Sequence, residues 1–120
     1  MGKPQSFQDL LFWKKAHQFV FAVYKETERF PEKEKYGLES QFRRAAVSIP
    51  ANIAKGWKKQ SVKDRLRFFN ISQGSIEECR YYLILARDLD YIKFNEILNE
   101  QLEEVSKMLN AYCQKMIASC

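Results

Sequence analysis

Apolar residues recur along most of the chain at intervals of three and four, the spacing that places side chains on one face of an α-helix. In residues 7–29, the first predicted helix, two such stripes run side by side. A single core needs only one stripe, so the second stripe predicts either deep burial or a contact with another subunit. The first stripe contains Leu10, Trp13, His17, Val20 and Tyr24, and the second contains Phe12, Ala16, Phe19 and Val23.

The boundaries of this helix follow from local signals. Ser6 to Asp9 resembles a capping box, in which a hydroxyl and an acid satisfy the first free amides. The helix is predicted to end near Arg29, before Pro31. The residues that follow, as far as Gly37, mix both charges with Pro and Gly, which is typical of a solvated connector.

The second predicted helix, residues 37–59, has one apolar stripe and a proline in its interior. Pro50 removes one amide donor and crowds the carbonyl of Ala46, at a cost of about 3 kcal/mol in an ordinary helix interior. We therefore expect a kinked but continuous helix. Its stripe consists of Leu38, Phe42, Ala45, Ile49, Ile53 and Trp57.

The third predicted helix, residues 62–89, starts at a second capping box, Ser61 to Asp64. Its centre holds the small residues Ser72, Gly74 and Ser75. Because Gly costs roughly 1 kcal/mol against Ala in a helix, this clustering predicts the close approach of another backbone. The fourth predicted helix, residues 94–117, has the stripe Leu98, Leu102, Val105, Leu109, Tyr112 and Met116.

Four amphipathic helices with short connections predict an all-α fold, an antiparallel up-down-up-down four-helix bundle, because each apolar stripe must find a partner. A length of 120 residues fits a single domain, 1–120. The longest apolar run, residues 19–24, is far below the roughly 20 residues that span a bilayer. The beginning of the chain has no apolar leader with a cleavage site, so the expected location is cytoplasmic.

Candidate chemistry is sparse in this sequence. Cys79, Cys113 and Cys120 lack the paired spacing of a zinc site, so we expect reduced thiols and neither metal nor cofactor. His17 is the only histidine, and its place on an apolar stripe favours a core side chain. No glycine-rich phosphate loop or nucleophile motif is present, so the sequence does not indicate an enzyme or a small-molecule substrate.

Charge is distributed very unevenly. Residues 42–68 contain eight basic residues and one acid, Asp64, a net charge of +7. Because the whole chain carries +5, the remaining residues carry −2. Such an asymmetry favours contact with a polyanion. The basic residues are Arg43, Arg44, Lys55, Lys58, Lys59, Lys63, Arg65 and Arg67.

Two interpretations of these cations stay open. In the first they bind the phosphates of RNA or DNA, with affinity supplied by counterion release. In the second, Lys55, Lys58 and Lys59 only complement the dipole at a helix C-terminus, and the protein is an interaction or structural adaptor. Lys63 and Arg65, with Arg67, favour the first, because cations near a helix start are disfavoured by the same dipole.

One polar residue falls on the apolar stripe of the second helix. Asn52 continues the spacing of Ala45 and Ile49, so its amide is expected to be buried and to need partners. We hypothesise a structural polar network that fixes helix register, a role that buried Asn has in coiled coils. Its predicted members are Asn52, Ser75, Glu78 and Arg44.

The stretches QFRRAAVSIPANIAKGW and QGSIEECRYYLILARDLDYI resemble a bacterial family. Its members are small four-helix-bundle proteins encoded by intervening sequences in 23S rRNA genes, often with a ribosomal-protein name. The resemblance covers residues 7–112 and implies a ring-like homo-oligomer, a pentamer, with a suspected role in binding RNA or DNA. Lys55 stands where the family pattern has Glu, which either changes a buried ion pair or makes the surface more basic.

Overall fold

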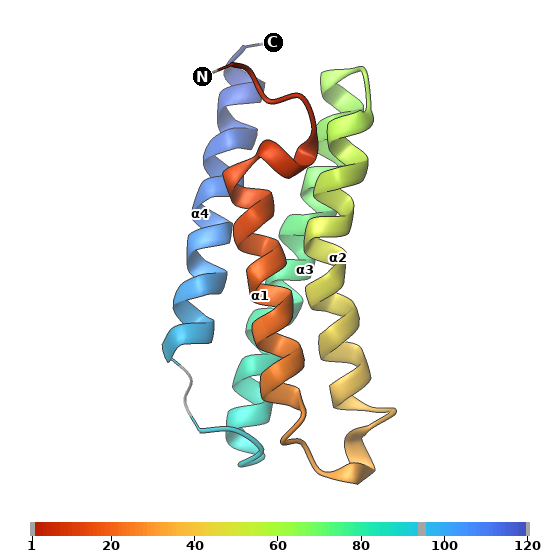
Figure 1. Cartoon of the computed structure of the whole chain (residues 1–120), viewed down its shortest axis with the longest axis vertical. Helices are drawn as coiled ribbons and strands as arrows, with labels where there is room; N and C mark the ends of the chain where they lie inside the picture. Colours follow the sequence, from red (N-terminus) through yellow and green to blue (C-terminus); the bar gives the residue numbers. More distant parts are fainter. Residues whose placement is uncertain (1, 94–95, 120) are drawn as a thin grey trace.

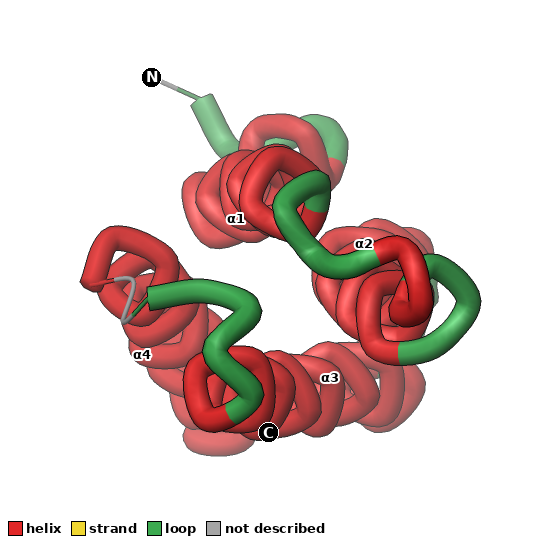
Figure 2. Tube along the Cα trace, turned by 90° about the horizontal axis from the view of Figure 1, so that it is seen from below, coloured by secondary structure: helices red, strands yellow, loops and turns green. Residues whose placement is uncertain are grey.

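The computed structural model describes residues 2–93 and 96–119. Within them the elements follow the order η1 (Phe7–Asp9), α1 (Leu11–Thr27), η2 (Glu32–Glu34), α2 (Leu38–Lys58), α3 (Val62–Asp88) and α4 (Glu96–Ala118). Successive α-helices run in opposite directions (Figure 1). Each packs against the next and α4 packs against α1, so the four helices form a square seen end-on (Figure 2). The predicted all-α four-helix bundle is confirmed.

The capping box at Ser6 forms, but it closes only a single 3₁₀ turn. The Asp9 carboxylate accepts the amides of Gln5 and Ser6 at 3.0 and 3.3 Å, and the Ser6 hydroxyl accepts the Gln8 amide at 3.2 Å. Leu10 then leaves the helical region, with φ −77° and ψ 125°. The α-helix therefore begins after this residue and not at the cap. The predicted start of the last helix, residue 94, lies outside the described residues.

Of the two stripes on α1, the core takes the second, whose members are all buried. Adjacent stripes point about 100° apart, so only one of them can face the bundle axis. The first stripe is turned outward beyond Leu10. His17 is exposed and stacks on Trp13, with ring centroids 5.0 Å apart. The rings of His17 and Phe21 form a T-shaped pair, with centroids 4.9 Å apart. The prediction of a core histidine is wrong.

The α2–α3 pair contains both the interior proline and the small residues. α2 runs unbroken through Pro50, which is buried; a kink there stays a prediction. Ser72 is fully buried, and its hydroxyl donates to the Ile49 carbonyl of α2 at 2.8 Å. Gly74 is exposed, and a Cβ at this position would meet no atom within 4 Å. Its predicted contact with another backbone is wrong, because it lies on the solvent side of α3.

The close approach occurs instead at Gly56, near the end of α2. A Cβ on this residue would lie 2.7 Å from Cε1 of Phe69 and 3.2 Å from the Arg65 carbonyl oxygen of α3. Phe69 is fully buried at the centre of the core and lies edge-on to Phe12, with ring centroids 6.2 Å apart.

No described helix has the length and apolarity needed to cross a membrane.

Candidate nucleic-acid interface

The end of α2 and the start of α3 meet at one end of the bundle, at the top of Figure 1. Residues 59–61 make the turn, and the Ser61 hydroxyl caps α3 by accepting the Asp64 amide at 3.1 Å. This turn brings together five of the predicted cations, which we call the basic tip. The basic tip consists of Lys58, Lys59, Lys63, Arg65 and Arg67.

Aromatic rings hold the cations of the basic tip without neutralising them. The Arg65 guanidinium lies 4.9 Å from the centre of the Trp57 ring, and its Nε donates to the Lys59 carbonyl at 2.7 Å. Lys59 and Arg67 both lie over the Phe68 ring, at 5.0 and 5.1 Å. Such cation–π contacts contribute roughly 0.5–1 kcal/mol at exposed sites. Three of the five cations, Lys59, Arg65 and Arg67, are thus positioned by rings and keep their positive charge available to an anion.

No ion pair between residues described in the structure involves a cation of the basic tip. The nearby acid Asp64 is exposed and lies in the first turn of α3, where the helix dipole stabilises it. The dipole also favours Lys58 at the end of α2 and opposes Lys63 at the start of α3. Helix-end electrostatics therefore explains only part of this concentration of charge.

Arg44 and Lys55 lie elsewhere, in a hollow along the outer face of α2. We call this hollow the α1–α2 groove. Both cations are exposed there. The groove is lined by Tyr24, Lys35, Tyr36, Glu39, Ser40, Arg43, Arg44, Val47, Ser48, Ala51, Asn52 and Lys55.

The groove has a volume of about 760 Å³ and is open to solvent. Among the eight predicted cations, Arg43 is the one that forms an ion pair with an acid in the described part of the chain. It pairs with Glu39 at 3.1 Å, donates to the Thr27 hydroxyl at 2.8 Å and to the Tyr24 carbonyl at 3.2 Å, and covers the Tyr24 ring at 4.5 Å. These contacts clamp α2 to the end of α1. Arg43 is therefore a structural residue in this fold, and the groove keeps Arg44 and Lys55 as its outward-facing cations on α2.

The floor of the groove contains a neutral polar network. The Asn52 amide donates to both the carbonyl and the hydroxyl oxygen of Ser48, each at 2.9 Å, and the Ser75 hydroxyl of α3 donates to the same Ser48 hydroxyl at 2.8 Å. Asn52 and Ser75 are thus joined through Ser48. Sequence reasoning missed Ser48, although its position four residues before Asn52 places both on one helix face.

The other two predicted members lie outside this network. Glu78 is exposed, and its carboxylate accepts the Tyr82 hydroxyl at 3.4 Å. It belongs to the turn of α3 after Ser75, on the side that faces solvent. Arg44 is exposed on the groove wall. The prediction for Glu78 is corrected accordingly. Burial, followed by the negative charge of Glu78, raises the pKa of Tyr82.

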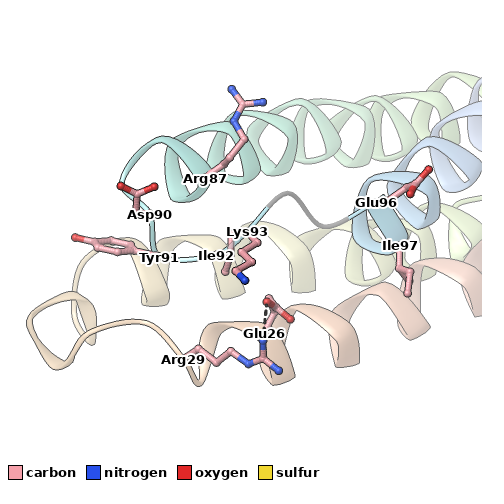
Figure 3. Close-up of a pocket in the computed structure, with 9 residues that line it drawn as sticks. All are labelled: Glu26, Arg29, Arg87, Asp90, Tyr91, Ile92, Lys93, Glu96 and Ile97. Carbon is pink, nitrogen blue, oxygen red and sulfur yellow. Dashed lines mark ion pairs between the residues drawn. The ribbon is translucent and has the colours of Figure 1, made fainter.

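A larger hollow, of about 1100 Å³, lies at the opposite end of the bundle under the α3–α4 connection (Figure 3). Its lining contains three cations and three acids, so it concentrates no charge of either sign. Glu26 and Arg29, three residues apart at the end of α1, form an ion pair at 3.7 Å on one side of the hollow, and Arg87 points away from it. The charge balance makes it a weaker candidate for a polyanion than the basic tip. The charged residues are Glu26, Arg29, Arg87, Asp90, Lys93 and Glu96.

The cysteines provide no reactive thiol in the described part of the chain. Cys79 and Cys113 are buried and not joined in a disulfide. Burial raises the pKa of Cys79 to about 12 and also raises the pKa of Cys113, so both stay protonated at neutral pH. Cys120 lies outside the described residues.

A family model described as 23S rRNA-intervening sequence protein matches residues 8–111. The chain belongs to this family. The chain is similar in structure to a protein with unknown function from the S23 ribosomal protein family of Bacteroides thetaiotaomicron. The TM-score between the chain and that crystal structure is 0.61. The two are 24% identical, over 90% of this chain and 96% of that one, which shows a shared fold. No curated protein matches the chain.

Lys55 stands where the family pattern has Glu, and its position shows whether this difference changes a buried ion pair or makes the surface more basic. Lys55 is exposed on the α1–α2 groove and forms no ion pair with any residue that the structure describes. The exchange therefore alters no buried pair in this family member. It makes the groove more basic.

Proposed function

We propose that this protein is a non-enzymatic homo-oligomer that binds RNA or DNA through the basic tip. The observation that carries the proposal is the concentration of five cations on one end of the bundle. Three of them lie over the rings of Trp57 and Phe68, and none of the five is paired with an acid in the described part of the chain. Cations in this state attract phosphates and release condensed counterions from nucleic acid. Identical tips in an oligomer multiply the effect through effective concentration.

A salt titration tests this proposal. Binding of labelled RNA and DNA fragments is measured by fluorescence anisotropy at increasing salt for the wild type and for the K63A/R67A variant. Arg65 is kept because it bonds to the Lys59 carbonyl. We expect a linear loss of log affinity with log salt, and a slope lower by about 1.4–1.8 in the variant, since each phosphate contact contributes roughly 0.7–0.9.

The charge-matched control is K25A/K93A, which removes two exposed lysines far from the basic tip in sequence. Its slope should stay close to that of the wild type. Equal loss in the two variants would show that net charge, and not the basic tip, attracts the nucleic acid. The absence of binding to any fragment at low salt would show the proposal to be wrong.

The second candidate function is an interaction or structural adaptor without nucleic-acid binding. The observation that favours it is the outward face of α1, where Phe21 is 65% exposed and Tyr24 is 42% exposed. Exposed apolar side chains gathered on one helix are typical of a protein contact surface. This candidate replaces the first if no nucleic acid binds at low salt while the protein still associates through α1.

A further inference from the structure

We propose that the α1–α2 groove holds one strand of a single-stranded nucleic acid that runs from the basic tip along α2. This inference rests on the proposed function and extends it, because it names the form of nucleic acid and a second contact surface. The groove differs from the basic tip in being concave, with a volume of about 760 Å³. Its wall along α2 is formed in part by the small residues Ser48 and Ala51, which leave the hollow open.

The groove has an excess of positive charge. The one acid among its lining residues, Glu39, forms an ion pair with Arg43, with 3.1 Å between the carboxylate oxygen and the guanidinium nitrogen. Lys35, Arg44 and Lys55 form no ion pair with any residue in 2–93 or 96–119. Three cations around a hollow without a free acid attract a negatively charged ligand.

The spacing of the cations indicates an extended ligand. Arg44 and Lys55 are eleven residues apart on one helix, a separation of about 16 Å at 1.5 Å per residue. A single phosphate does not reach across that length, whereas the backbone of a strand presents phosphates at intervals. Lys58 follows Lys55 by about one turn and belongs to the basic tip, so the cations continue from the groove to the end of the bundle.

The size of the groove favours a single strand over a duplex. A volume of about 760 Å³ lies within the range of roughly 300–1,000 Å³ for pockets that enclose small molecules. It accommodates a few linked nucleotides but not the width of a double helix. The Tyr36 ring, 89% exposed at the groove edge, offers a face on which an unpaired base can stack.

Length-dependent binding of oligouridine RNA tests this inference. Oligomers of about 4 to 16 nucleotides are titrated against the wild type and the R44A/K55A variant. We expect affinity for the wild type to rise with length as the strand extends beyond the basic tip into the groove. In R44A/K55A that rise should be lost and the salt slope for the longest oligomer should fall by about 1.4, while the shortest oligomer binds as before.

Two further variants separate the groove from net charge. K93A/K107A removes two exposed lysines outside the groove and should keep the rise with length. Ala51→Trp fills the groove without changing charge and should abolish the rise in affinity with length, with circular dichroism confirming that the helices are intact.

A rise in affinity that persists in both R44A/K55A and Ala51→Trp overturns the inference but leaves the basic tip as a binding site. A duplex that loses affinity equally in R44A/K55A overturns the choice of a single strand, and absence of all wild-type binding overturns the proposed function as well.

Discussion

At the scale of single residues, two glycines show how packing reverses an intrinsic preference. Ala is favoured over Gly by about 1 kcal/mol in a helix interior. At Gly74 the added methyl group would meet nothing within 4 Å, so Ala should stabilise the helix there relative to Gly. At Gly56 it would lie 2.7 Å from the ring of Phe69, which is fully buried and has little room to move.

The two Gly→Ala variants should therefore change stability in opposite directions. Gly74→Ala should raise the free energy of unfolding by up to about 1 kcal/mol. Gly56→Ala should lower it, because overpacking a core costs roughly 1–3 kcal/mol and exceeds the helix-propensity gain. Urea unfolding monitored by circular dichroism measures both. A Gly56→Ala variant more stable than the wild type would mean that α2 and α3 separate at no cost.

At the scale of elements, Glu34 of η2 is bonded both to the start of α2, four residues later, and to the connection after α3, which is distant in sequence. One carboxylate oxygen accepts the Leu38 amide at the start of α2 at 3.1 Å, and the other accepts the Tyr91 hydroxyl from the connection after α3 at 2.7 Å. Gly37, the residue before α2, has no side chain to cap the helix, so Glu34 takes that role. The Tyr91 hydrogen bond, followed by the Leu38 amide, lowers the pKa of Glu34 below its usual value of 4.5.

This junction should make stability sensitive to acid. A carboxylate with a lowered pKa in the folded state stabilises it above the unfolded pKa, and this contribution is lost as pH falls through the folded pKa. Unfolding followed from neutral pH to below about 4.5 should therefore show a shallower loss of stability in Glu34→Gln than in the wild type. Glu32→Gln, on the same 3₁₀ helix, is the control and should keep the wild-type slope. Identical slopes in all three proteins would contradict a role for Glu34.

At the scale of the whole molecule, the bundle leaves apolar side chains exposed on the outward face of α1. The inward stripe of α1 is buried, and the outward face exposes large side chains among half-buried ones. Removing such surface from water contributes about 25 cal/mol per Å². We propose that a second copy of the chain covers this face in the homo-oligomer. The face consists of Trp13, His17, Val20 and Phe21.

Replacing two exposed residues of this face should dissociate the oligomer. Sedimentation velocity at micromolar concentration is expected to show an assembly for the wild type and a smaller species for the variant H17S/F21S. The control, Ile97→Ser, changes an apolar residue of α4 that is 69% exposed and should leave the assembly intact. A wild type that sediments as a monomer would show that α1 does not mediate self-association under these conditions.

Much of the fold could be predicted from the sequence, but details of the site could not. The spacing of apolar residues located the helices because each helix must bury one apolar stripe against its neighbours. The spacing gave the wrong result for His17, because α1 has two apolar stripes and only one of them can face the core. The small residues gave the wrong result for Gly74, because composition does not show which side of α3 faces a neighbouring helix. Glu34 was missed because its partner Tyr91 is far away in sequence. Ser48 could have been found from its spacing of four residues to Asn52, but its bond to Ser75 of α3 depends on how the helices pack.

The sequence by itself determined that four amphipathic helices form and that positive charge gathers in residues 42–68. Only the tertiary structure decided how that charge is divided. Arg43 is used to clamp α2 to α1, Arg44 and Lys55 face the groove, and the other five cations form the basic tip. The physical reason is that helix formation depends on neighbours along the chain, whereas the surroundings of a charge depend on which helices pack beside it.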